Sequence, residues 1–343
     1  MNKKANMNQS LGRVAAWGLV IGCLALPGGI LGQDKKEPTP LTVSAPLKLT
    51  GFSQFLFTAW DKDTDSSGAR IDSFSARRVR LTLSGEIFKN VSYKLQVDAV
   101  KSPIVLDALV EFKLAPEVGI RVGQFKVPFS QENLTSSSDL DTINRSTPEE
   151  KLAPGRDIGA NGRDIGAALF GKYSVLEYGL GVFNGSGIDR KDDNSHKDVG
   201  GRLVVRPVDF LSIGAAFYQG RKILSAGQPA VDRNRTGLEL AVIRDSFSLK
   251  GEYIFAKDDK IKKSGWYLQG GWFVMSKKLQ AVLKVDAYDK DRQTPDNRTN
   301  LWTAGLNWFF TAKSKLQVNY ELYKLEGGKT DNSAFLVQLQ AGF

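Results

Sequence analysis

Nine basic side chains are spaced so that they could bind anions along one path. Arg78 and Arg80 lie two residues apart, so they share one face of a strand. The other seven are Lys94, Arg121, Lys126, Arg145, Arg156, Arg163 and Arg202. A guanidinium group can donate two parallel hydrogen bonds to two oxygens of a phosphate-like anion. These residues predict a path for small anions, and phosphate is the best-matched solute.

Four of these residues belong to a long polar segment, residues 126–164. Its prolines and glycines fix bends. A connection of roughly forty residues is too long to be an ordinary turn, and such loops usually carry function. If the surrounding chain forms a barrel, this loop can fold inward and narrow the pore.

The elements that must hold these residues show alternating hydrophobicity. Val91, Tyr93, Leu95 and Val97 alternate with polar residues, and the same period of two recurs in 279–287, 316–322 and 335–343. This period is typical of strands with one apolar face. We find no convincing amphipathic helix after the N-terminal segment. Apart from its first 46 residues, the chain is therefore predicted to be all-β.

The connections between the predicted strands alternate between short and long. Short turns fall near 89–90, 115–117, 172–174, 207–209, 245–246, 276–278 and 311–314. Longer polar loops fall near 60–72, 101–106, 126–164, 184–198, 220–235, 257–265, 289–299 and 324–333. This alternation predicts a transmembrane antiparallel β-barrel of about sixteen strands, with short periplasmic turns and an inward-folding third loop. Closure would also remove exposed strand edges.

The ends of the chain also indicate an exported outer-membrane protein. Lys3, Lys4 and Arg13 precede or flank an apolar run, which predicts a signal peptide over 1–32. A flexible leader follows over 33–46, and the barrel occupies 47–343. An alternative is that Cys23, the only cysteine, is a lipidated N-terminus. The chain ends on Phe343 after alternating apolar residues, as outer-membrane barrel strands do.

Five short strings, three in or next to the long loop and two that precede it, carry a family resemblance. The string GQFKVPFSQENLTSS (123–137), followed by INRS (143–146) and LAPGRDIG (152–159), resembles the phosphate-selective porins O and P. RRVRL (77–81) and YKLQVD (93–98) resemble the segment that precedes them in that family. The resemblance implies a trimeric channel in the outer membrane of a Gram-negative-type bacterium, with a constriction between Lys126 and Arg156.

Charge and site chemistry limit the remaining classes. The formal net charge of +10 fits nucleic acid, acidic lipid or small anions. An exported, alternating chain disfavours nucleic acid. His196 is the only histidine, so neither a transition-metal site nor a Ser-His-Asp enzyme is expected, and no cofactor is implied. Two alternatives to the anion channel stay open: a general or sugar and nutrient porin, and a non-conducting outer-membrane scaffold.

Overall fold

The computed structural model describes residues 47–61, 71–223, 227–326 and 333–343. The predicted signal peptide and leader, and Cys23, lie outside these residues. In the described part, no helix is long and apolar enough to cross a membrane.

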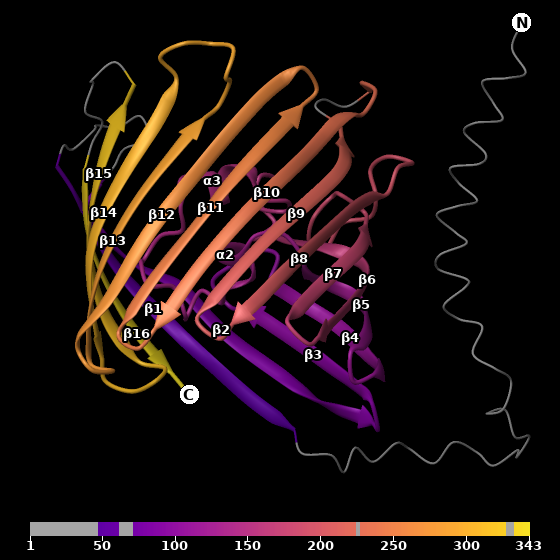
Figure 1. Cartoon of the computed structure of the whole chain (residues 1–343), viewed down its shortest axis with the longest axis horizontal. Helices are drawn as coiled ribbons and strands as arrows, with labels where there is room; N and C mark the ends of the chain where they lie inside the picture. Colours follow the sequence, from indigo (N-terminus) through magenta and orange to yellow (C-terminus); the bar gives the residue numbers. More distant parts are fainter. Residues whose placement is uncertain (1–46, 62–70, 224–226, 327–332) are drawn as a thin grey trace, which may run out of the picture. The chain divides into compact units, whose positions relative to one another are not determined.

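Sixteen antiparallel strands form one closed barrel, because β1 pairs with β16 as well as with β2 (Figure 1). The first eight are β1 (Lys48–Trp60), β2 (Ser73–Phe88), β3 (Val91–Asp98), β4 (Val105–Ala115), β5 (Val118–Lys126), β6 (Arg163–Tyr173), β7 (Leu176–Phe183) and β8 (Asp198–Val208). The others are β9 (Leu211–Lys222), β10 (Val231–Arg244), β11 (Phe247–Asp258), β12 (Ile261–Met275), β13 (Leu279–Asp289), β14 (Arg298–Phe309), β15 (Lys315–Leu325) and β16 (Ala334–Gly342). The predicted fold class and strand number are confirmed.

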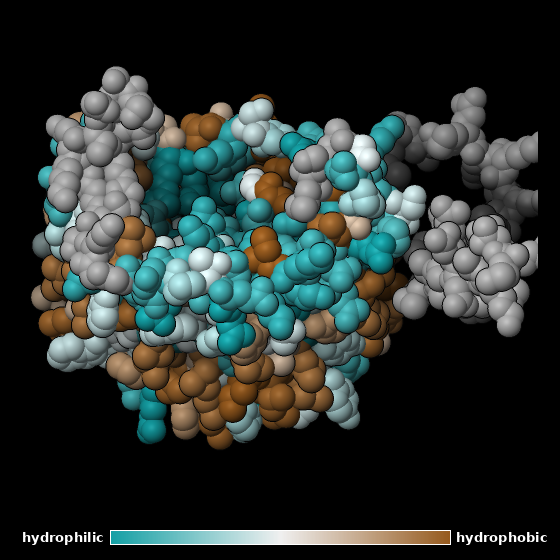
Figure 2. All heavy atoms as spheres, turned by 90° about the horizontal axis from the view of Figure 1, so that it is seen from above, coloured by the Kyte–Doolittle hydropathy of each residue, from teal (hydrophilic) through white to brown (hydrophobic). Residues whose placement is uncertain are grey.

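The two faces of the wall follow the period of two in the sequence. On β14, Trp302, Leu306 and Trp308 are exposed on the outside, whereas Thr303 and Asn307 are buried inside. Figure 2 shows hydrophobic residues on the outer wall and hydrophilic residues around and within the open end. The wall is therefore apolar towards its surroundings and polar towards its lumen, as a barrel in lipid requires.

All seven predicted short turns join strands at one end of the barrel. Asn90 (φ 68°) and Asp245 (φ 52°) take the left-handed conformation that tight hairpin turns need. One predicted long loop is wrong. β11 ends at Asp258 and β12 begins at Ile261, so residues 257–265 are mostly strand. The Asp258 carboxylate forms an ion pair with Lys263 of the neighbouring strand at 2.7 Å. Cross-strand pairing therefore accommodates the charged residues that suggested a loop.

The β5–β6 connection, residues 127–162, lies inside the barrel and is called the inner loop below (Figure 1). It contains two short helices, α2 (Gln131–Leu134) and α3 (Thr147–Leu152), which the sequence prediction missed. Ser130 and Ser146 cap them by accepting hydrogen bonds from the N–H groups of Asn133 and Glu149. Helices of four and six residues are too short to show helical periodicity.

Apolar packing holds the inner loop inside a largely polar lumen. Val127, Phe129 and Leu152 are fully buried against wall residues, among them Tyr218 and Ile254. On the other side of the lumen, Ile143 packs against Ala334 and Leu336. The loop also packs closely against the wall at Gly265, where a Cβ would lie only 2.5 Å from the Pro148 Cβ. The loop is thus a packed part of the barrel, and its polar residues have fixed positions.

Candidate functional site: a basic cavity in the barrel lumen

A cavity of about 470 Å³ opens on the side of the inner loop that faces the long connections. We call it the outer cavity. Its charged lining comprises nine basic residues and one acidic residue: Arg77, Arg78, Arg80, Lys101, Lys126, Arg145, Lys151, Arg156 and Arg163, with Glu150. Ser137, Asn144, Thr147, Asn161, Leu301 and Tyr323 complete it. Strands β2, β5 and β6 and the inner loop supply most of the cations.

Six of the nine residues singled out from the sequence line this cavity: Arg78, Arg80, Lys126, Arg145, Arg156 and Arg163. The other three lie elsewhere, each paired with an acid. The Lys94 Nζ lies 2.7 Å from Asp107, and the Arg121 guanidinium lies 2.5 Å from Glu111. Arg202 pairs with Glu239 at 2.5 Å and with Glu177 at 3.3 Å, near the end with the short turns.

Arg77, Lys101 and Lys151 also line the cavity, and sequence reasoning missed them. Strict alternation from Arg78 would place Arg77 on the outer face. The ladder between β1 and β2 pairs Gln54 with Arg78 and Phe55 with Ala76, which leaves Arg77 in a β-bulge. A bulge inserts one unpaired residue and shifts the direction of its side chain. No sequence signal marks the bulge, since Arg77 is neither a glycine nor a proline.

Several of the nine cations are neutralised by acids behind the cavity surface. Arg80 pairs with Asp98 at 2.9 Å, and Arg163 pairs with Asp107 at 2.5 Å. In both pairs the two side chains are nearly or fully buried. Removing one partner of such a pair strongly destabilises a protein, because the other charge stays buried and uncompensated. Arg80 and Arg163 therefore contribute to the rigidity of the wall as well as to its charge.

Three cations, by contrast, have neutral partners only within the described part of the chain. Arg77 donates to the Oδ1 of Asn144 at 2.6 Å, and Arg78 donates to the Oε1 of Gln54 at 2.8 Å. The Lys126 Nζ donates to three carbonyl oxygens of the inner loop, those of residues 133, 134 and 135. These contacts orient the three side chains, and in the described part of the chain no acid forms an ion pair with them.

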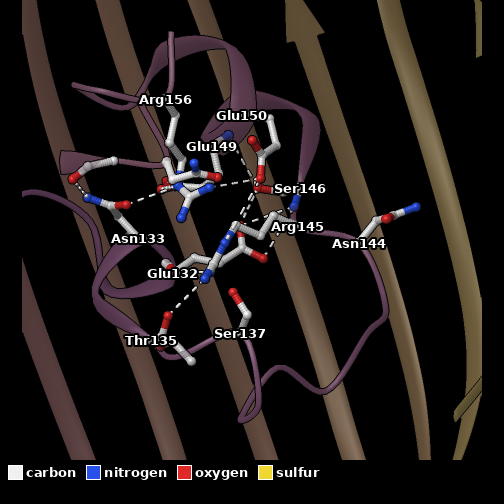
Figure 3. Close-up of polar contacts among 12 residues, drawn as sticks. Glu132, Asn133, Thr135, Ser137, Asn144, Arg145, Ser146, Glu149, Glu150 and Arg156 are labelled. Atoms are coloured by element: carbon white, nitrogen blue, oxygen red, sulfur yellow. Dashed lines mark hydrogen bonds and ion pairs between the residues drawn. The ribbon is translucent and has the colours of Figure 1, made fainter. Parts of the chain in front are cut away.

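The inner loop adds a compact charged cluster that combines both signs (Figure 3). The Arg156 guanidinium lies 3.1 Å from Glu149 and 2.9 Å from Glu150, and Arg145 lies 3.9 Å from Glu150. Arg145 also donates to the carbonyl oxygens of Glu132 and Thr135. Burial lowers the pKa of Arg145 to about 10, so its guanidinium stays charged at neutral pH. The effect of burial outweighs the opposing attraction of Arg156 and raises the pKa of Glu149 to about 7.

A second cavity of about 430 Å³ lies on the other side of the inner loop, and we call it the inner cavity. It reaches Asp209 and Phe210 in the β8–β9 turn, so it faces the end with the short turns. Its charged lining comprises five acids and three bases: Glu132, Asp139, Asp141, Glu177 and Asp209, with Arg202, Arg206 and Lys250. The lumen is therefore strongly basic on one side of the loop and weakly acidic on the other.

This arrangement suits the passage of solutes better than covalent chemistry. Among the described residues, no three His, Cys, Asp or Glu side chains gather in a way that could hold a metal ion. His196 lies on an exposed loop, where its ring contacts Arg221. Charged side chains surround the space on both sides of the inner loop, mainly basic on one side and more acidic on the other. Charged side chains that line a pore act on the ions that pass it.

A closed sixteen-stranded barrel with an apolar outer wall, a polar lumen and an infolded loop is the architecture of an outer-membrane porin. The family described as "Phosphate-selective porin O and P" matches residues 48–226 and 219–341. The chain belongs to this family. It is accordingly an outer-membrane channel protein and not an enzyme, as the sequence predicts.

Solved structures with the same fold share little sequence with this chain. The outer membrane channel DcaP of Acinetobacter baumannii superposes with a TM-score of 0.65 at 13% identity, over 91% of this chain and 100% of that chain. Salmonella typhi OmpF, in complex with daunomycin, gives 0.61 at 13% identity over 86% and 97%. OmpT of Vibrio cholerae in its trimer form gives 0.59 at 11% identity over 87% and 99%. No curated protein matches the sequence.

Proposed function

We propose that this porin is an anion-preferring diffusion channel for phosphate or a similar oxyanion. The observation that supports the proposal is the outer cavity, where nine basic residues face one acid. Arg77, Arg78 and Lys126 have the leading role, because their partners are neutral amide or carbonyl oxygens. Their charge is available to an anion that enters from the side of the long connections, which is the extracellular side in outer-membrane barrels.

Simple electrostatics gives the scale of the preference. One fixed cation attracts a monovalent anion by up to about 4 kcal/mol at 4 Å and an effective dielectric constant near 20, before desolvation is subtracted. Several cations in one cavity therefore concentrate anions and exclude cations. Passage also requires escape, and a row of comparable weak sites releases ions that one deep site would trap.

Three related properties belong to the same proposal. The chain is exported by its first 32 residues, it contacts outer-membrane lipid through its apolar outer wall, and it assembles as a homotrimer. The trimer form of Vibrio cholerae OmpT, which shares the barrel fold, supports the last of these. A mass consistent with three chains in mild detergent is the expected result of light scattering.

The experiment that tests the proposal is the reversal potential of the refolded protein in a planar bilayer under a potassium chloride gradient. An anion-preferring potential, with chloride current blocked by added phosphate, is the expected result. A weakly selective or cation-preferring potential would contradict the proposal and indicate a general or nutrient porin. No conductance at all would indicate a scaffold.

A further inference from the structure

Arg77 and Glu321 have opposite charges and face the same part of the lumen, yet they form no ion pair among the described residues. Asn144 of the inner loop lies between them. Its Oδ1 accepts a hydrogen bond from the Arg77 guanidinium at 2.6 Å. Its Nδ2 donates to both carboxylate oxygens of Glu321, at 2.9 and 3.1 Å. One neutral amide therefore satisfies a cation and an anion that would otherwise neutralise each other.

The orientation of this amide is fixed by its two partners. A guanidinium group can only donate hydrogen bonds, and an ionised carboxylate can only accept them. The reverse orientation of Asn144 would place its NH₂ group against Arg77 and its oxygen against Glu321. Asparagine suits this position because its side chain carries an acceptor and a donor on one short, planar group.

The backbone of Asn144 is anchored to the wall at several points. The buried Lys284 Nζ donates to the carbonyl oxygen of Asn144 at 2.8 Å and to the Thr142 Oγ1 at 2.9 Å. The preceding N–H of Ile143 donates to Asn319 at 2.7 Å. Figure 3 shows the Asn144 side chain directed away from the Arg145 and Arg156 cluster. The loop thus holds this amide in place independently of that cluster.

Glu321 is held equally well on its own side. It is only 1% exposed, and it also accepts a hydrogen bond from the Tyr323 hydroxyl at 2.9 Å. A buried carboxylate needs hydrogen-bond donors in place of the water it has lost. Asn144 and Tyr323 supply them, so Glu321 does not require Arg77.

We propose that Asn144 is a specificity-determining residue, which keeps Arg77 available to anions by separating it from Glu321. This inference rests on the proposed function, since it explains how one cation of the outer cavity retains its charge. The inference gives the inner loop a role beyond narrowing the lumen, because the loop controls which wall cations are neutralised. Asn144 acts through Arg77 and is therefore a positioning residue.

The test compares Asn144→Ala in the wild-type background with the same substitution in a Glu321→Gln background. Alanine is too short to bridge the two groups, so Arg77 and Glu321 can move together and pair. We expect the anion-to-cation permeability ratio, measured from reversal potentials in potassium chloride, to fall at least about twofold, the lower end of coupling within one polar network. In the Glu321→Gln background the same substitution should leave the ratio unchanged, because no acid remains to pair with Arg77.

The design separates the possible failures. If Asn144→Ala lowers the ratio equally in both backgrounds, the residue acts by supporting the loop and the inference is wrong. If it changes the ratio in neither, the inference is also wrong. The change in the permeability ratio is measured relative to the parent protein. The comparison therefore remains valid if the parent protein does not prefer anions. A parent protein without anion preference would refute only the proposed function. Asn144→Ser, which also cannot reach both partners, repeats the test if the alanine variant refolds poorly.

Discussion

Arg77 and Arg78 are neighbours in the chain, yet both guanidinium groups contact lumen residues. Arg78 donates to Gln54 on β1, and Arg77 donates to Asn144 on the inner loop. In a regular strand, successive side chains point to opposite faces, so one of them would face lipid. The bulge in β2 prevents this and places two cations with neutral partners side by side in the outer cavity.

Replacing Arg78 with glutamine should therefore lower anion preference without unfolding the barrel. The variant Arg78→Gln keeps an amide that can bond to Gln54 but removes one unneutralised charge. We expect the anion-to-cation permeability ratio to fall about threefold, which corresponds to ~0.6 kcal/mol. The matched control is Arg244→Gln, because the Arg244 side chain is 70% exposed and lines neither cavity. Equal effects of the two substitutions would contradict a special role for the outer cavity.

A different arginine should be important for stability rather than for selectivity. Arg233 is fully buried, 2.5 Å from Asp157 of the inner loop and 3.7 Å from Asp198. Burial alone would raise the pKa of Asp157, but Arg233 and Arg235 outweigh it and lower that pKa. Arg233→Gln would leave buried carboxylates underneutralised, which costs about 3–5 kcal/mol. Denaturant unfolding in detergent, followed by tryptophan fluorescence, measures the loss.

For this stability prediction Arg244→Gln again serves as the control and should unfold at the wild-type denaturant concentration. An Arg233→Gln variant that is as stable as the control would show that the ion pairs between β10 and the inner loop are dispensable.

The different charges of the two cavities should make the current depend on its direction. Anions concentrate in the outer cavity and cations are tolerated in the inner cavity, where five acids face three bases. A potential that drives anions from the outer to the inner cavity moves both ion types into the lumen, so the current should be larger in that polarity. Asp139→Asn combined with Asp209→Asn should reduce the asymmetry and leave the sign of ion preference unchanged. Current–voltage curves of one-sidedly inserted channels measure both, and a symmetric wild-type curve would refute the prediction.

The inner loop should also make stability depend on pH through Glu149. Burial raises the pKa of Glu149 to about 7 in the folded protein, from an ordinary value of 4.5. The folded state then binds more protons than the unfolded state between these values, so the free energy of unfolding falls as pH rises from about 4.5 to 7. Glu149→Gln should make this decline less steep. The exposed Glu86→Gln is the control, and identical slopes in all three proteins would contradict the assignment.

The sequence by itself determined the wall of this protein. Alternating segments such as 91–97 and 279–287 fixed the strands and their apolar faces, because a period of two depends only on local backbone geometry. The short turns fixed antiparallel pairing, and the number of strands followed. Four predicted cations, Arg78, Arg80, Lys126 and Arg163, line the outer cavity for the same reason, because they lie on strands. Arg145 and Arg156 line it because the inner loop that carries them folds into the lumen.

Only the tertiary structure decided which charges remain available. Arg80 and Arg78 share a face, yet Asp98 neutralises the first while Gln54 leaves the second charged. Arg77 was missed because a bulge breaks the alternation without a sequence signal. The position of Asn144 between Arg77 and Glu321 joins residues that are far apart in the chain. Such partners are selected by long-range packing of the inner loop against the wall, and no local pattern in the sequence records that packing.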